Sequence, residues 1–104
     1  MRRVMVRYKV KPDQVDRNEE LVRGVYEELR QVEPEGLRYA TFRLEDGVSF
    51  VHVHSNESSN GSNALTELPA FKAFQQRIGE RCEEPPVVTG LHEIGSFRFF
   101  ETDA

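Results

Sequence analysis

The Asp46-Gly47 pair lies between two runs of alternating apolar and polar residues, and this feature constrains the fold more than any other. The runs, 37–45 and 48–54, are typical of antiparallel strands joined by a type I′ turn, which needs positive φ at both central positions. A two-residue turn at this pair sets the register of the whole hairpin. One face then pairs Phe42 with Val51, Ala40 with Val53 and Leu44 with Ser49, and the other pairs Tyr39 with His54, Thr41 with His52 and Arg43 with Phe50.

The rest of the chain alternates between the hydrophobic periods of strands and of helices. In order, the predicted elements are a strand at 4–10, a helix at about 13–33, the hairpin, a loop at 55–63, a short helical turn at 64–68, a helix from Pro69 to about Cys82, and a bent last strand at 87–101. The order β-α-β-β-α-β predicts an α+β, ferredoxin-like fold, in which two helices cover one face of a four-stranded antiparallel sheet. We expect residues 1–104 to form one domain, since the sequence shows no linker or repeat.

Two helices can cover only one face of such a sheet, so the other face needs a partner. We expect the more aliphatic side to receive the helices: Val4, Val6 and Tyr8 with Ala40, Phe42, Leu44, Val51 and Val53. The opposite side would carry Met5, Arg7, Lys9, Tyr39, Thr41, Arg43, Phe50, His52 and His54. That face is too aromatic for an ordinary wetted surface, which predicts a homodimer whose sheets enclose a partly polar cavity.

Composition excludes several classes of function. The net charge of −4 opposes general binding to nucleic acid, which normally requires a basic excess. No apolar run approaches the roughly 20 residues that cross a bilayer, and the first residues do not resemble a secretory signal. Cys82 is the single cysteine, which fits a reducing compartment. We therefore expect a cytoplasmic protein without nucleic-acid or membrane partners.

Four stretches resemble the dimeric α+β barrel superfamily, and particularly its antibiotic biosynthesis monooxygenase branch: MVRYKVKPDQVD, PEGLRYATFRLEDGVSFVHVHSNES, ALTELPAFKAF and LHEIGSFRFF. The resemblance implies a homodimeric barrel with a pocket between sheet and helices or within the barrel. It also implies relatives that are cofactor-free oxygenases of aromatic polyketide-type or quinol substrates, others that degrade haem, and many without known activity. His52 and His54 stand where that branch often has Glu and Trp. The chain has no tryptophan, so the Asn/Trp/His arrangement of haem-degrading relatives is not present, and no cofactor is expected.

The two strand histidines admit three interpretations. His52, His54, Tyr39 and Arg43 could orient and deprotonate a phenolic or enolic ligand, with His54 as base and Arg43 as anion partner. If His92 joins them, three histidines could hold a metal ion, although no carboxylate accompanies them and Arg43 opposes a cation. They could also be half-buried polar residues that fill a dimer interface.

The sequence therefore predicts a cofactor-independent, monooxygenase-like enzyme for a small aromatic or enolisable molecule, with no resident metal. The alternative is a non-catalytic protein of the same fold that binds a small molecule or serves a stress response. A purely structural interaction module is the third possibility.

Overall fold

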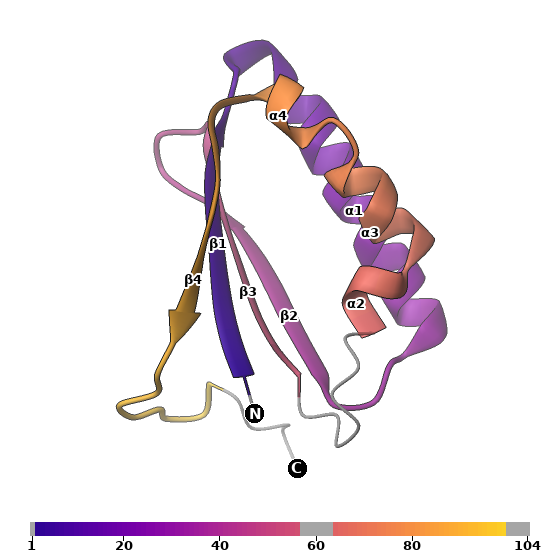
Figure 1. Cartoon of the computed structure of the whole chain (residues 1–104), viewed down its shortest axis with the longest axis vertical. Coiled ribbons are helices and arrows are strands. Elements are labelled where there is room, and N and C mark those ends of the chain that lie inside the picture. Colours follow the sequence, from indigo (N-terminus) through magenta and orange to yellow (C-terminus); the bar gives the residue numbers. More distant parts are fainter. Residues whose placement is uncertain (1, 57–63, 100–104) are drawn as a thin grey trace.

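A computed structural model describes residues 2–56 and 64–99, and it confirms the α+β, ferredoxin-like architecture (Figure 1). The elements are β1 (Arg2–Val10), η1 (Pro12–Gln14), α1 (Val15–Val32), β2 (Leu37–Arg43), β3 (Ser49–Asn56), α2 (Ala64–Glu67), α3 (Pro69–Gln75), α4 (Ile78–Arg81) and β4 (Cys82–Leu91). The strands form one antiparallel sheet in the order β2-β3-β1-β4. No helix in this described part is long and apolar enough to cross a membrane.

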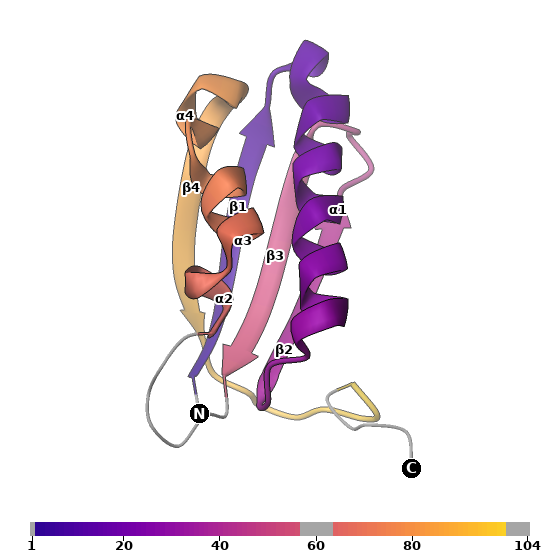
Figure 2. The same ribbon diagram turned by 90° about the vertical axis from the view of Figure 1, so that its right-hand side faces the viewer.

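All helices lie on one side of the sheet, with α1 beside β2 and β3 and the α2–α4 segment beside β1 and β4 (Figure 2). The core fills the space between these layers. It is built around Tyr8, Val10, Phe50 and Cys82 from the sheet, and Val22, Val25, Leu65, Leu68, Phe71 and Phe74 from the helical side. The opposite face of the sheet, which we call the open face, carries no helix of the described residues (Figure 1).

The pairing within the predicted hairpin is confirmed, but the predicted assignment of its faces is wrong. The sheet register places Val6 opposite His52 and Tyr8 opposite Phe50, and directly opposed residues share a face. Because β1 points Val6 and Tyr8 at the helices, His52 points there too. The aliphatic set Ala40, Phe42, Val51 and Val53 therefore lies on the open face. The pairing of β3 with β1 decides which face of the hairpin meets the helices, and the sequence pattern of the hairpin alone does not report that pairing.

The Asp46-Gly47 turn keeps the predicted register with a different geometry. Only Gly47 has positive φ, at 79°, so the turn is not type I′. Leu44 N donates to Ser49 O at 2.9 Å, and Gly47 N donates to Leu44 O at 3.0 Å. The Asp46 carboxylate accepts hydrogen bonds from the Ser49 hydroxyl at 2.5 Å and from the amides of Ser49 and Val48 at 2.8 and 3.0 Å, and these bonds, the hydroxyl's above all, lower its pKa. The turn is therefore held by hydrogen bonds to the Asp46 side chain, and Asp46 itself does not adopt the left-handed backbone that a type I′ turn requires.

The second half of the chain departs from prediction where a helix was expected to continue to Cys82. Arg77 adopts left-handed φ of 59° and divides that helix into α3 and α4. Cys82 is instead the first residue of β4 and pairs with Val10. Pro85 and Pro86 were predicted to precede the last strand, yet they lie within it. An edge strand accommodates residues that lack an amide hydrogen, and the pairing is irregular at this point.

The other predicted ends also move. The last strand stops at Leu91, so 92–99 follow it without regular structure, while 100 and 101 lie outside the described residues. Of the predicted loop at 55–63, Ser55 and Asn56 belong to β3. The remainder of that loop also lies outside the described residues.

Candidate functional site

A cavity of about 290 Å³ lies between the sheet and the α3–α4 segment, and we call it the inner pocket. Its lining comes from all four strands and from α3 and α4: Val6, Tyr8, Tyr39, His52, His54, Phe71, Phe74, Gln75, Ile78, Pro86 and Val88. Among these described lining residues there is no lysine, arginine, aspartate or glutamate. The walls are therefore aromatic and aliphatic, with polar groups contributed by two tyrosines, two histidines and one glutamine.

His52 is the most constrained polar side chain of this pocket. It is 3% exposed, and both ring nitrogens are hydrogen-bonded. Nε2 lies 2.8 Å from Tyr8 Oη, and Nδ1 lies 2.6 Å from Tyr39 Oη and 3.0 Å from Thr41 Oγ1. The ring also stacks between Tyr8 and Tyr39, with centroid distances of 5.3 and 5.7 Å. Such a residue has a defined orientation that a ligand would not easily change.

Burial sets the protonation states at this site. Loss of hydration, with a smaller contribution from nearby His54, lowers the pKa of His52 to about 4. His52 is therefore neutral at physiological pH. Burial likewise raises the pKa of the Tyr8 and Tyr39 hydroxyls well above the usual value of 10.0, so both phenols keep their protons. The site is a set of neutral hydrogen-bonding groups.

His54 lies one strand repeat beyond His52 on the same face and also lines the inner pocket. It is half-buried, and its ring meets the Tyr39 ring nearly edge-on with centroids 6.4 Å apart. The structure therefore brings together three of the four predicted site residues. They face the helices of their own subunit, which corrects the prediction that they line a cavity between two sheets.

Arg43, the fourth predicted residue, is not among the lining residues of the inner pocket. Its Nη1 lies 2.7 Å from Glu19 Oε2, and half of its side chain is exposed. Glu19 also binds Arg23, at 3.2 Å, so the predicted anion partner belongs to a surface ion-pair group. Tyr39, and not Arg43, contacts both His52 and His54.

The three-histidine alternative is wrong. His92 follows the end of β4 and is exposed, whereas His52 is buried under the helices. Among residues 2–56 and 64–99, no three histidine, cysteine, aspartate or glutamate side chains are grouped so that they could hold a metal ion.

Two polar residues that support the site were not identified from the sequence. Asn18 is fully buried on α1, and its Nδ2 donates to Tyr8 Oη at 2.9 Å. Arg81 at the end of α4 is buried as well and reaches Asn18 Oδ1 at 3.3 Å. Asn18 had a detectable signal, because a polar residue stands in the apolar stripe between Val15 and Val22. Arg81 had none, since sequence periodicity does not report which charged residue is buried.

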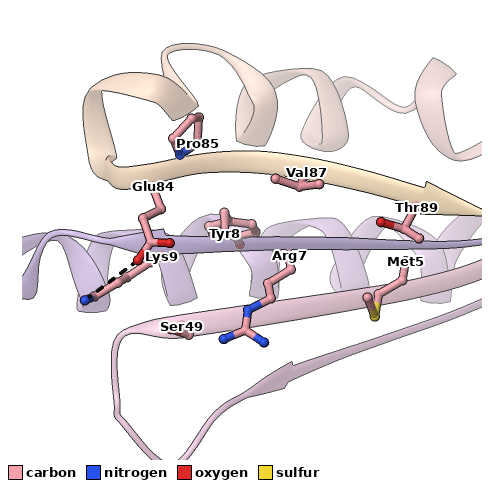
Figure 3. A pocket seen from close by; sticks show the side chains of 9 residues that line it. All are labelled: Met5, Arg7, Tyr8, Lys9, Ser49, Glu84, Pro85, Val87 and Thr89. Atoms are coloured by element: carbon pink, nitrogen blue, oxygen red, sulfur yellow. Dashed lines mark ion pairs between the residues drawn. The ribbon is translucent and has the colours of Figure 1, made fainter.

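A second hollow, of about 440 Å³, lies on the open face along β1 and β4 (Figure 3). Met5, Arg7 and Lys9 lie here, on the face predicted for them, together with Glu84 and Val87. Figure 3 looks onto this face with the helices behind the sheet, and it shows the Lys9–Glu84 ion pair, whose atoms are 3.9 Å apart. None of the predicted site residues lines this hollow.

Comparison with known proteins places the chain among small α+β proteins of one type. A family model described as antibiotic biosynthesis monooxygenase matches residues 1–77. A crystal structure of an antibiotic biosynthesis monooxygenase matches with a TM-score of 0.74 and 21% identity, covering 91% of this chain and 100% of that chain. No curated protein matches.

Other solved structures share the fold without agreeing on a role. Rv0793 from Mycobacterium tuberculosis matches with a TM-score of 0.74 and 21% identity, covering 91% of this chain and 96% of that one. NE2512, a protein of unknown function from Nitrosomonas europaea, matches with a TM-score of 0.70 and 14% identity, covering 92% and 91%. At these identities the likeness establishes the fold alone.

Proposed function

This chain belongs to the antibiotic biosynthesis monooxygenase family, and we propose that its inner pocket binds a small aromatic or enolisable molecule and oxygenates it without a bound cofactor. The observation that carries the proposal is the convergence of His52, His54 and Tyr39 on one aromatic cavity beneath α3. Family membership supports a monooxygenase-like role in general terms. The substrate class is argued from the walls of the pocket.

The inner pocket favours a neutral, flat ligand. Its volume of about 290 Å³ stands at the small end of ligand sites, which run from roughly 300 to 1,000 Å³. The Phe71 ring meets the Tyr39 ring edge-on and the Phe74 ring at a tilt, which leaves ring faces and edges for an aromatic ligand. A charged ligand would lose its hydration against these walls without gaining an opposite charge. We therefore propose a phenol or enol of one or two rings.

The chemistry assigns different work to the two histidines. His52 has both nitrogens engaged, so it orients its neighbours, whereas His54 lines the pocket and is the proposed base. His54 takes the hydroxyl proton of the phenol, and Tyr39 donates a hydrogen bond to the oxygen that becomes negative. The anion gives one electron to dioxygen, and the two radicals combine as a carbon–oxygen bond. The resulting hydroperoxide, once protonated, loses water, so phenol and dioxygen become quinone and water.

The open face supports a homodimer, which is the assembly we propose. Phe42 is 52% exposed and Val87 is 62% exposed, and both lie on this face with Val51 and Val53. Packing two such faces together would remove these apolar side chains from water. Members of this family are generally dimeric. Because the single cysteine of this chain suits a reducing compartment, we propose a cytoplasmic location for the protein.

The proposal is tested by measuring oxygen consumption by the protein with each member of a panel of phenols and naphthols. We expect turnover with at least one small phenol or naphthol and a fall in kcat of about 100-fold or more for His54→Ala, the range that a general base contributes. His92→Ala is the matched control, because His92 is exposed outside the inner pocket. Equal turnover by His54→Ala and the parent would exclude His54 as the base.

A non-catalytic binding protein, with or without a role in a stress response, is the second candidate. It is favoured by one observation: the described lining holds no arginine or lysine to stabilise an anion, because Arg43 is paired with Glu19 elsewhere. Saturable binding of a naphthol with no oxygen consumption would support this candidate.

A further inference from the structure

A series of buried hydrogen bonds runs from α4 to the inner pocket, and the first of them determines which group donates in each of the others. The guanidinium of Arg81 is buried, and its Nε lies 3.3 Å from Asn18 Oδ1. Its terminal nitrogens donate to the backbone carbonyls of Phe74 and Gln76, at 2.6 and 3.2 Å. A guanidinium donates hydrogen bonds and accepts none. Asn18 must therefore turn its amide oxygen toward Arg81 and its amide nitrogen away.

The direction passes from Asn18 to His52 through Tyr8. Asn18 Nδ2 can only donate, so Tyr8 Oη, 2.9 Å away, accepts. The Tyr8 proton then points to His52 Nε2, at 2.8 Å. Since Nε2 accepts this bond and the imidazole is neutral, the ring proton of His52 is on Nδ1.

At the pocket end, the Nδ1 proton determines what the neighbouring hydroxyls can do. Nδ1 lies 2.6 Å from Tyr39 Oη and 3.0 Å from Thr41 Oγ1, so each oxygen faces a donor. Neither hydroxyl can then give its own proton to His52. Thr41 also contacts Tyr26 Oη at 2.8 Å, between α1 and β2. Tyr39 lines the inner pocket, where its proton can go to a ligand.

We propose that Arg81 and Asn18 are positioning residues, which hold His52 with its proton on Nδ1 and thereby make Tyr39 a hydrogen-bond donor to the ligand. The class of ligand that this arrangement selects is neutral and carries an acceptor oxygen, such as an aryl ketone or the oxygen of a phenol. The same donor would stabilise the oxyanion that forms when the base takes a proton. The ligand part rests on the proposed function, whereas the position of the ring proton is a property of the empty protein.

Replacing the amide of Asn18 by a carboxylate should reverse the direction of these hydrogen bonds, which tests the inference. In Asn18→Asp the carboxylate accepts from Arg81 and also from Tyr8, because it has no proton to donate at neutral pH. The Tyr8 oxygen then accepts from His52 Nε2–H, and Nδ1 becomes an acceptor for Tyr39. Gln31→Glu, an exposed amide-to-carboxylate change on the same helix, is the matched control. Tyr8→Phe is a second variant, because it removes the donor to Nε2 without adding charge.

The readout is nitrogen NMR of protein labelled at its histidines, which reports which ring nitrogen carries the proton. The parent and Gln31→Glu are expected to show His52 protonated on Nδ1, and Asn18→Asp and Tyr8→Phe on Nε2. A loss of packing alone would not move the proton between nitrogens. A parent protonated on Nε2, or an Asn18→Asp protein that still has its proton on Nδ1, overturns the inference.

The ligand part is tested with two probes of similar shape, 1-tetralone and 1-naphthol. The ketone can only accept a hydrogen bond from Tyr39, whereas the naphthol can also donate one. In Asn18→Asp the Kd of 1-tetralone should rise about fivefold to tenfold relative to that of 1-naphthol, as expected for one hydrogen bond. An unchanged ratio with a moved ring proton overturns the donor role of Tyr39. If neither probe binds the parent, the pocket's proposed function fails, and the NMR result still decides the direction of these hydrogen bonds.

Discussion

His52 shows how one buried residue ties stability to pH. Its pKa in the folded protein is about 4, while the ordinary value of 6.5 applies to the unfolded chain. Between these two values the unfolded chain takes up a proton at this position and the folded chain does not. The stabilisation is therefore complete above about pH 6.5 and is lost as the pH falls toward 4.

We predict that this one residue removes about 3 kcal/mol of the free energy of unfolding between pH 7.5 and pH 4, as the pKa difference requires. Urea unfolding of the parent and of His52→Gln at several pH values measures it. The variant should lack this share of the pH dependence, whereas His92→Gln, at an exposed position, should keep it. If the parent and His52→Gln lose stability equally with falling pH, His52 is not the group responsible.

Tyr8 makes a second prediction at the scale of single residues. Its hydroxyl serves both Asn18 Nδ2 and His52 Nε2, and all three groups are buried. Tyr8→Phe leaves Asn18 Nδ2 and His52 Nε2, which are both buried, without their partner, and this should cost about 1–3 kcal/mol for each such group. Tyr26→Phe is the comparison, because Tyr26 is only partly buried and bonds a single hydroxyl. Chemical denaturation that finds the Tyr26 change the more costly would contradict this ranking.

At the scale of elements, two glycines test the account of the hairpin and of α1. Gly47 has φ of 79°, where a side chain is strained, so Gly47→Ala should destabilise the protein by about 1–2 kcal/mol. Gly24 lies within α1, and nothing lies within 4 Å of an added Cβ, so Gly24→Ala should stabilise it by about 0.5–1 kcal/mol. Thermal unfolding measures both. A Gly47→Ala protein as stable as the parent would show that the turn does not depend on left-handed backbone, and a destabilised Gly24→Ala protein would contradict the account of α1.

The elements also show how much of this protein could be predicted from its sequence. The hydrophobic periods gave the order of elements, and the position of Gly47 gave the register of the hairpin, because both are local. Which hairpin face meets the helices depends on the pairing of β3 with β1. That pairing is not local, since Tyr8 and His52 are 44 residues apart in the sequence. Both hairpin faces hold residues suited to burial, so composition could not decide between them. His52, His54 and Tyr39 were found because they alternate on one strand pair, while Asn18 and Arg81 join them only through hydrogen bonds between α1, α4 and the sheet.

At the scale of the whole molecule, the two faces of the sheet divide the work. The inner face holds the aromatic pocket and its polar network, and the open face holds aliphatic residues that no element of the described chain covers. The aliphatic set that sequence reasoning assigned to the core is therefore the set best suited to contact a second copy. A small domain gains most from such a contact, because it buries a limited fraction of its surface alone.

Phe42→Glu tests this division. The parent should have twice the 12.0 kDa mass of the chain in sedimentation equilibrium and in light scattering. A carboxylate on the open face would be buried unpaired in a sheet-to-sheet dimer, which should weaken association by about 3–5 kcal/mol, or more than 100-fold. Val32→Glu is the control: Val32 is 54% exposed, nearly the same as Phe42 at 52%, but it ends α1 on the helical side. A monomeric parent would contradict the dimer, and a Val32→Glu protein that dissociates as readily as Phe42→Glu would move the contact to the helices. Retention of the inner-pocket probes by monomeric Phe42→Glu would show that each subunit builds its own site, as the position of His52 beneath its own helices requires.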